Sequence, residues 1–411
     1  MFSAVVSVSL PLSTLPMKHI ITLCMALVPI STYAMLPTLT SRITKTPYAR
    51  HQKRYDTTAT KALTQHKKWS PIQRKLTRAE MACQVSRMPL DEDIKKRLHA
   101  MIRSYETPET ALGHIFALPW GTYTQDQYDI KKSRELLDRD HYGMASTKQH
   151  VLDLLAVKKL SGGSSSYNPI WCFVGAPGIG KTAICRSIAE CMNRTFAKIA
   201  MGGARDESII RGWPASYKSA TAGRIVHELI HAKSMNPVIL LDEIDKVGKG
   251  SEGDNLSSAL LELLDPEQRG SFTDHYITIP LDFSQVTFIA TANYVDKIAE
   301  PLKDRMEMIH ISGYSPHEKA IIARKHLIPK ILKTSGMTQY PLEISDDSLN
   351  YLINNYCPEQ GVRRLEQCLR RIIAAHARSL LEHHNPLSCA PATLSRLLGK
   401  KSNHQDSTYI W

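Results

Sequence analysis

The sequence contains no pair of cysteines at the C-x-x-C spacing, although eight cysteines are scattered over its 411 residues. Several of them lie in apolar stretches, as Cys172 does within the run IWCFV. A disulfide framework is therefore disfavoured, and buried free thiols in a reducing compartment fit this distribution better.

Acidic residues are almost missing from residues 1–78, which hold twelve lysines and arginines but only one acid, Asp56. This segment therefore carries eleven of the net positive charges that make up the total of +13. Because the rest of the chain is nearly neutral, an extended basic surface is not indicated, and we do not expect nucleic-acid binding.

The sequence also has no apolar run that is clearly a membrane span. The run from Ile20 to Leu36 is at the short limit for a span and is broken by Pro29. The segment MKH before it and STYA within it imitate a secretory signal. The longer acid-poor stretch to Arg78 is instead typical of an organelle transit peptide. A disordered basic leader without any targeting role is the third interpretation.

Helical periodicity begins near Ala79, where one predicted helix places Ile94, Leu98, Met101 and Ile102 on one face. The pattern is broken at residues 118–120, and further helices are predicted from about 129 and over 144–160. SGGSSS at 161–166 is the only low-complexity stretch, and no internal repeat is present.

Beyond this stretch, short apolar runs alternate with amphipathic segments. The runs predict strands and the segments predict helices; the strands are at 170–175, 195–201, 238–241 and 286–291, and the helices at 182–193, 223–234 and 256–264. This alternation predicts a parallel sheet covered on both faces. After Tyr314 the pattern is all-helical, which predicts a smaller second domain with helices at 316–333, 345–354 and 360–381.

The run GAPGIGKT, at 175–182, fits the phosphate-binding pattern G-x-x-x-x-G-K-[ST] between a predicted strand and a predicted helix. Its glycines let the backbone curl around a phosphate, and Lys181 can reach the β- and γ-phosphates. Thr182 can offer its hydroxyl to Mg²⁺. The predicted nucleotide-binding residues of this loop are Gly175, Ala176, Pro177, Gly178, Ile179, Gly180, Lys181 and Thr182.

The run VILLDE ends in two carboxylates, which are costly at the end of a buried strand unless a cation or hydrogen bonds satisfy them. We predict that Asp242 holds Mg²⁺ and that Glu243 orients and deprotonates the attacking water. Asn293 ends the strand TFIATAN, where its amide can orient water or contact the γ-phosphate. These residues predict an ATP-hydrolysing site.

These motifs, together with LDRDHYG, LDPEQ, FTDHYITIPLDFS, DRMEMIHISGY and GVRRLE, resemble the ATPase module of Lon-type ATP-dependent proteases over about residues 88–400. The resemblance implies an α/β AAA+ P-loop ATPase with a parallel sheet, a small all-α lid and an N-terminal helical segment. We accordingly divide the chain into a mostly disordered basic leader (1–78), a helical linker region (79–137), the nucleotide-binding domain (138–312), the lid (313–395) and a tail (396–411).

The resemblance also implies a hexameric ring that binds ATP and Mg²⁺ and acts on unfolded proteins. Arg305 in DRME corresponds to the arginine finger that reaches a neighbouring subunit, and Arg363 in GVRR corresponds to the sensor arginine of the lid. His141 and Tyr142 correspond to residues that wrap the adenine. Tyr217 corresponds to the pore-loop aromatic that grips a threaded polypeptide.

The sequence departs from the family pattern in two ways that affect function. The match fades near residues 397–400, so the family's serine–lysine peptidase dyad cannot be assigned. Lys218 stands where the family has an apolar residue after the pore-loop aromatic, which puts the grip on apolar substrate in doubt.

The run HELIH, at 227–231, matches the zinc-binding pattern H-E-x-x-H. It lies between the phosphate loop and the paired carboxylates, on a helix that must pack against the sheet, and no third ligand follows in an obvious context. We therefore interpret His227 and His231 as partly exposed helix histidines.

Three functions remain open from the sequence. The chain is an ATPase motor of the Lon type, an ATPase subunit completed by a separate serine peptidase chain, or a truncated and inactive remnant. Because dependence on ATP disfavours export, we favour the mitochondrial matrix or a similar organelle, with the cytoplasm as the alternative.

Overall fold

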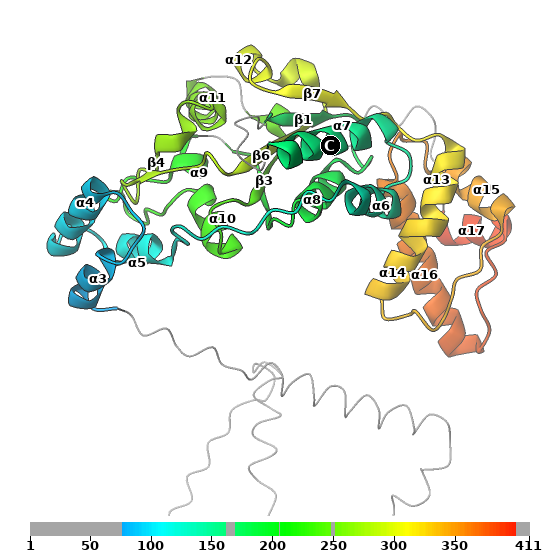
Figure 1. Ribbon diagram of the computed structural model, residues 1–411. Coiled ribbons are helices and arrows are strands. Elements are labelled where there is room, and N and C mark those ends of the chain that lie inside the picture. The colour runs from blue at the N-terminus through cyan, green and yellow to red at the C-terminus, as the bar shows by residue number, and fades with distance from the viewer. Residues whose placement is uncertain (1–75, 162–168, 205, 248–250, 400–411) are drawn as a thin grey trace, which may run out of the picture. The chain divides into compact units, whose positions relative to one another are not determined.

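Five parallel strands form the centre of the fold in the order β2-β3-β6-β1-β7 (Figure 1). Their bounds are Trp171–Val174 for β1, Phe196–Ala200 for β2, Val238–Asp242 for β3, Thr287–Ala292 for β6 and Glu307–His310 for β7. Four of these strands lie within one or two residues of the predicted positions. We did not predict β7, a short edge strand whose run EMIH is only partly apolar.

The structure is a computed structural model that describes residues 76–161, 169–204, 206–247 and 251–399. These residues belong to a unit that begins at Leu76. Nearly all of the predicted leader, and most of the predicted tail and of the SGGSSS stretch, lie outside the described residues. Within them, no helix combines the length and the apolar character that a bilayer crossing requires.

The central strands are mostly apolar, as expected for a sheet covered on both faces. Alternate residues of each strand belong to different buried clusters. Cys172, Ile239 and Phe288 belong to one cluster, whereas Phe173 and Leu240 belong to the other. The α/β class and the two-sided sheet are therefore confirmed.

The helices divide between these two clusters according to their position in the chain. The second cluster receives α6 (Ile130–Asp140), α7 (Ala145–Leu160) and α8 (Lys181–Cys191). The first receives α9 (Ser208–Arg211), α10 (Arg224–Ala232), α11 (Ser251–Leu264) and α12 (Glu300–Lys303). A small antiparallel pair, β4 (Phe272–Thr273) and β5 (Pro280–Leu281), also lies on that side.

The N-terminal helices share a core with the sheet. They are α3 (Arg78–Val85), α4 (Glu92–Arg103) and α5 (Glu109–Ala117). Leu98 and Ile102 of α4 are buried, and Ile94 and Met101 pack beside them, as the helical spacing predicts. The Trp120 indole N–H donates to the Ile115 carbonyl at 2.7 Å, which holds the turn after α5. This region is therefore continuous with the α/β core.

The C-terminal helices form a separate apolar cluster. They are α13 (Pro316–Ile322), α14 (Ile328–Thr334), α15 (Asp346–Tyr356), α16 (Arg363–His383) and α17 (Pro391–Leu398). The segment predicted as one helix over 316–333 is helical throughout, but a π-helical stretch, Ala323–Leu327, divides it into α13 and α14. Pro329 has no backbone N–H to donate, which accounts for the altered hydrogen bonding of the preceding turn.

A buried ion pair joins the segment before α6 to the sheet. The Arg194 guanidinium donates from Nε and Nη2 to the two oxygens of Asp126 at 2.7 and 2.6 Å, and from Nη1 to the Gln285 carbonyl at 2.8 Å. Burial alone would raise the pKa of Asp126, but the hydrogen bonds from Arg194 and Tyr128 outweigh it and lower the pKa.

We expect Arg194→Ala to lower the free energy of unfolding by about 3–5 kcal/mol, because it leaves a carboxylate buried without its partner. The double variant Arg194→Ala/Asp126→Ala should cost less than the sum of the two single changes. Chemical denaturation measures both effects. Lys96→Ala, which breaks an exposed ion pair with Asp93, is the control and should cost less than about 1 kcal/mol. A loss of that small size for Arg194→Ala would contradict the structural role of the pair.

Candidate active site

The phosphate loop follows β1 and leads directly into α8. Val174 pairs with Ala292 of β6, and the Gly175 N–H donates to the Ala292 carbonyl at 3.2 Å. Gly178 and Gly180 have φ values of 77° and 99°, which side chains rarely allow. The loop therefore ends at the N-terminus of α8, where free backbone N–H groups favour an anion.

Lys181 connects the loop to the end of β6. Its ammonium group donates to the Gly175 and Ala176 carbonyls at 2.6 and 3.0 Å and to Asn293 Oδ1 at 2.7 Å. Burial lowers the pKa of Lys181, while the nearby carboxylates of Asp245 and Asp242 act in the opposite direction. The structure thus brings the phosphate loop and Asn293 together, as the sequence predicts.

Asp242, at the end of β3, lies among groups that favour its charged form. Its Oδ1 accepts hydrogen bonds from Thr291 and, at 3.5 Å, from the Thr182 hydroxyl, and its Oδ2 forms an ion pair with Lys198. Burial would raise the pKa of Asp242, but the hydrogen bonds from Lys198 and Thr291 outweigh it and lower the pKa. Thr182 and Asp242 together offer the hard oxygen ligands that Mg²⁺ prefers.

Glu243 adopts a left-handed backbone conformation with φ 60°, which is strained for a residue with a side chain. Its backbone N–H donates to Thr291 Oγ1 at 3.1 Å, and its carboxylate pairs with Lys246 at 2.9 Å. The carboxylate lies over Gly202, where an added Cβ would come within 2.5 Å of Oε2. The turn thus presents the Glu243 side chain at the rim of the site.

Asp245 was missed by the sequence reasoning. Its Oδ2 accepts the backbone N–H groups of Asn293 and Tyr294 at 3.1 and 3.2 Å, and it is 4% exposed. Its Oδ1 is buried and has no hydrogen-bond partner within the described part of the chain. The third acid of the run LLDEID was the available signal. Asp245 therefore holds the backbone of Asn293 in place, and its negative charge acts to raise the pKa of Lys181 against the effect of burial.

The helical domain contacts the phosphate loop directly. The Val362 N–H donates to the Gly178 carbonyl at 3.0 Å, and the Tyr314 hydroxyl donates to the Ile179 carbonyl at 2.9 Å. Arg363 begins α16 beside the loop, where a Cβ on Gly178 would lie 2.7 Å from the Arg363 Cβ. The sequence predicted Arg363 at the site but not the contacts made by Tyr314 and Val362.

His141 and Tyr142 lie between the two domains' helices. The His141 ring nitrogen Nε2 is hydrogen-bonded to Ser187 Oγ of α8 at 2.9 Å, and the side chain is buried. Tyr142 packs against the cluster of C-terminal helices. Burial lowers the pKa of His141 to about 4, so the ring is neutral at pH 7.

Arg305 lies away from this chain's own phosphate loop. It precedes β7, whose Glu307 pairs in parallel with Trp171 at the start of β1. The loop follows the other end of β1, and a strand of that length spans about 13 Å. Arg305 is exposed, and its Nη2 lies 3.4 Å from Asp265 Oδ2 beside a cavity of about 510 Å³.

Tyr217 does not belong to the candidate active site either. It is exposed on the loop between α9 and α10, apart from the phosphate loop, Asp242 and Glu243.

The H-E-x-x-H histidines differ in their surroundings. The His227 ring meets His114 edge-on, with centroids 4.9 Å apart, and its Nε2 is 3.2 Å from Thr221 Oγ1. His231 is exposed. A group of three His, Cys, Asp or Glu side chains able to hold a metal ion is not found in the described ranges.

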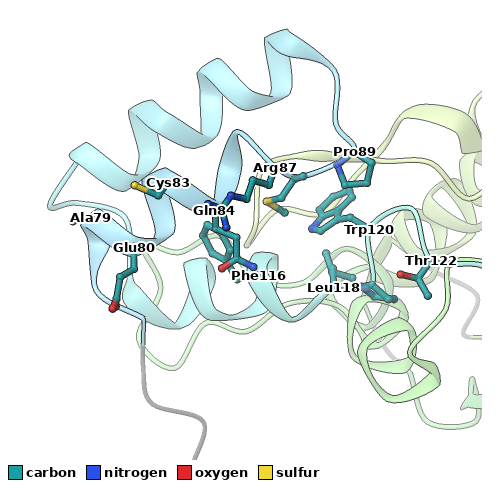
Figure 2. Close-up of a pocket in the computed structure, with 12 residues that line it drawn as sticks. Ala79, Glu80, Cys83, Gln84, Arg87, Pro89, Phe116, Leu118, Trp120 and Thr122 are labelled. Atoms are coloured by element: carbon teal, nitrogen blue, oxygen red, sulfur yellow. The ribbon is translucent and has the colours of Figure 1, made fainter.

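A larger cavity, of about 740 Å³, lies between α3 and the turn after α5 (Figure 2). Its walls include Cys83, Arg87, Phe116 and Trp120. Its lining contains no residue of the phosphate loop or of the carboxylate pair, so it is distinct from the candidate active site.

Comparison with known proteins agrees with this geometry. Residues 171–314 match the family model of the ATPase family associated with various cellular activities (AAA), and residues 333–388 match that of the Lon protease AAA+ ATPase lid domain. The chain is 44% identical over 313 residues to Lon protease of Aquifex aeolicus. It is 41% identical over 325 residues to the mitochondrial Lon protease homolog of Drosophila melanogaster and 40% identical over 314 residues to that of Homo sapiens.

These matches cover 75%, 78% and 76% of this chain. The chain spans only 39%, 31% and 32% of the length of the three relatives. The two family models, matched over residues 171–314 and 333–388, include the sheet, the phosphate loop, α15 and α16.

We expect the depressed pKa of His141 to make stability depend on pH. Because the folded-state pKa is about 4 and the unfolded value about 6.5, its contribution is complete above pH 6.5 and is lost as the pH falls toward 4. Because glutamine does not titrate, the free energy of unfolding of His141→Gln should fall by about 2 kcal/mol less than that of the parent when the pH is lowered from 7 to 5. Chemical denaturation at the two pH values measures this difference. Equal losses in parent and variant would contradict burial of a neutral His141.

Proposed function

We propose that this chain, which carries an AAA+ ATPase module of the Lon type, hydrolyses ATP with Mg²⁺ and uses the energy to unfold and thread protein substrates. The observation that carries the proposal is the convergence of Lys181, Asn293, Asp242 and Thr182 at the carboxyl ends of β1, β3 and β6. Parallel α/β sheets bind ligands at this edge.

Each residue at this edge has a role that follows from its chemistry. The N–H groups of residues 175–182 and the Lys181 ammonium bind the phosphates. Thr182 and Asp242 would hold Mg²⁺, which neutralises phosphate charge when bound. Glu243 orients the attacking water and accepts its proton, and Asn293, positioned by Asp245, orients the same water or the γ-phosphate.

The lid supplies the next set of groups. Arg363 begins α16 beside Gly178, so its side chain is long enough to reach a phosphate bound in the loop. Its guanidinium can then bind the γ-phosphate. His141 and Tyr142, between α8 and the C-terminal helices, are the proposed adenine contacts. Closure of the lid on the loop would thereby depend on whether the nucleotide carries its third phosphate.

Arg305 is proposed to act on the site of a neighbouring copy. Arg305 lies at the opposite ends of the strands from its own phosphate loop, so it cannot complete the site of its own chain. Its exposed guanidinium, beside Asp265, is accessible to a partner. A closed ring, of six subunits by family resemblance, places every arginine next to a neighbour's site. Tyr217, exposed on its loop, is the proposed contact with the threaded polypeptide.

For cellular location we propose the mitochondrial matrix or a similar organelle. The basic, acid-poor leader and the mitochondrial relatives support this location. Bacterial relatives match equally well, and the cytoplasm is therefore the alternative.

We expect Glu243→Gln to keep ATP affinity within a few-fold and to lose about 10²–10⁴-fold in turnover, because the amide cannot accept the proton of water. Calorimetric titration with Mg·ATP and a steady-state phosphate-release assay measure the two quantities. Glu135→Gln, an exposed change on α6, is the matched control and should behave as the parent. Parental turnover in Glu243→Gln would refute the site. Absence of hydrolysis by the parent at every protein concentration would favour an inactive remnant.

We expect Arg305→Ala to bind ATP normally but to lose at least about a hundredfold in turnover, since an arginine supplied in trans accelerates phosphoryl transfer by about 10³–10⁵. Mixing this variant with Glu243→Gln should restore part of the activity, because each Arg305→Ala site can receive Arg305 from a Glu243→Gln neighbour. Arg134→Ala on α6 is the matched control. A mixture no more active than its components would argue against action between subunits.

A further inference from the structure

The loop between α9 and α10 exposes two large aromatic side chains that contact each other. Trp213 is 41% exposed and Tyr217 is 58% exposed, and their ring centroids lie 5.5 Å apart at an interplanar angle of 55°. Among the described residues, neither the Trp213 indole N–H nor the Tyr217 hydroxyl has a hydrogen-bond partner. The two rings form one continuous aromatic surface with polar edges that are free to bind, which is the character of a contact site.

The stem of this loop is held on both sides. The Trp213 N–H donates to the Thr221 carbonyl at 3.0 Å and closes the neck of the loop. Asp274, which is fully buried, accepts the Gly223 N–H at 2.7 Å, and the His275 N–H donates to the Arg211 carbonyl at 2.6 Å. The segment after β4 therefore fixes both ends of the loop.

Gly223 is required at this stem because an added Cβ would lie 2.0 Å from the Ile210 carbonyl oxygen. Gly212, at the other end, has φ 74°. A rigid stem fixes the direction of the tip, so the Trp213 and Tyr217 rings are presented outward at little entropic cost to a ligand.

The tip, residues 213–221, contains few other groups that could hold a polypeptide. Tyr217 and Trp213 are its two aromatic side chains, and the exposed Lys218 is its one charge. An apolar segment flanked by acidic residues therefore complements the tip better than one flanked by basic residues.

We propose that Trp213 is a second substrate-binding residue, which forms with Tyr217 a two-ring surface for apolar side chains of an extended polypeptide. This inference rests on the threading function proposed above and assigns to it a residue and a substrate preference. Trp213 supplies the large apolar contact that the charged Lys218, next to Tyr217, does not supply.

The binding test uses two synthetic tryptophan-free peptides, in which leucine and phenylalanine are flanked either by aspartates or by lysines. Their affinity is measured by fluorescence anisotropy in the Glu243→Gln background with Mg·ATP. Trp213→Ala should lower affinity for the aspartate-flanked peptide about tenfold, and Trp213→Phe should remain within about threefold because it keeps a ring. Tyr340→Ala, an aromatic of similar exposure (51%) in the lid, is the control and should bind as the parent.

Two further measurements separate a direct contact from a structural effect. Covering Trp213 with peptide should shift tryptophan emission to the blue, and this shift should vanish in Trp213→Phe. The double variant Trp213→Ala/Tyr217→Ala should lose less peptide affinity than the product of the two single fold-losses, because both rings contact the same peptide side chains. Lys218→Glu should reverse the preference between the two peptides.

The outcomes distinguish this inference from the proposed function. If Tyr217→Ala loses affinity while Trp213→Ala binds as tightly as the parent, the role of Trp213 is refuted and the threading function stands. If the parent binds neither peptide in any nucleotide state, both are refuted.

Discussion

The hydrogen bond from the Lys181 ammonium to Asn293 Oδ1 joins the two halves of the nucleotide site. Lys181 stands at the start of α8 and Asn293 at the end of β6, so the bond depends on the parallel pairing of β1 with β6. Without that register the phosphate loop would have no fixed relation to the strand that carries the polar amide. The same ammonium also donates to two carbonyls of the loop and so stabilises the loop conformation. A bound phosphate could take the place of these carbonyls as the partner of Lys181.

Charge balance at this edge is a second constraint. Asp242, Glu243 and Asp245 lie within four residues of one another, and uncompensated carboxylates would repel each other. Lys198 pairs with Asp242, Lys246 pairs with Glu243, and backbone N–H groups bind Asp245. Because Lys198 already pairs with Asp242, a cation bound at Asp242 would compete with Lys198 for the same carboxylate.

The lid is hydrogen-bonded directly to the phosphate loop. The Val362 N–H and the Tyr314 hydroxyl both donate to carbonyls of residues 178–179, so the segments that lead into α16 and α13 are both hydrogen-bonded to the loop. The lid has an apolar cluster of its own, and Tyr314 packs against both this cluster and the one that contains α8. The role proposed above for Arg363 depends on this contact, because it places the start of α16 beside the loop.

The sequence by itself determined the α/β class, four of the five strands and the residues of the phosphate loop, because these depend on short stretches whose periodicity and glycine content specify local conformation. It also indicated that Asn293 and Asp242 lie at one edge, since both end buried strands. Only the tertiary structure decided that Asp245 positions Asn293, that Lys198 pairs with Asp242, and that Arg305 lies at the far end of the sheet from its own loop. It likewise decided that the N-terminal helices share the core of the sheet. These contacts join residues distant in the chain and arise from strand order and register, which local sequence patterns do not specify.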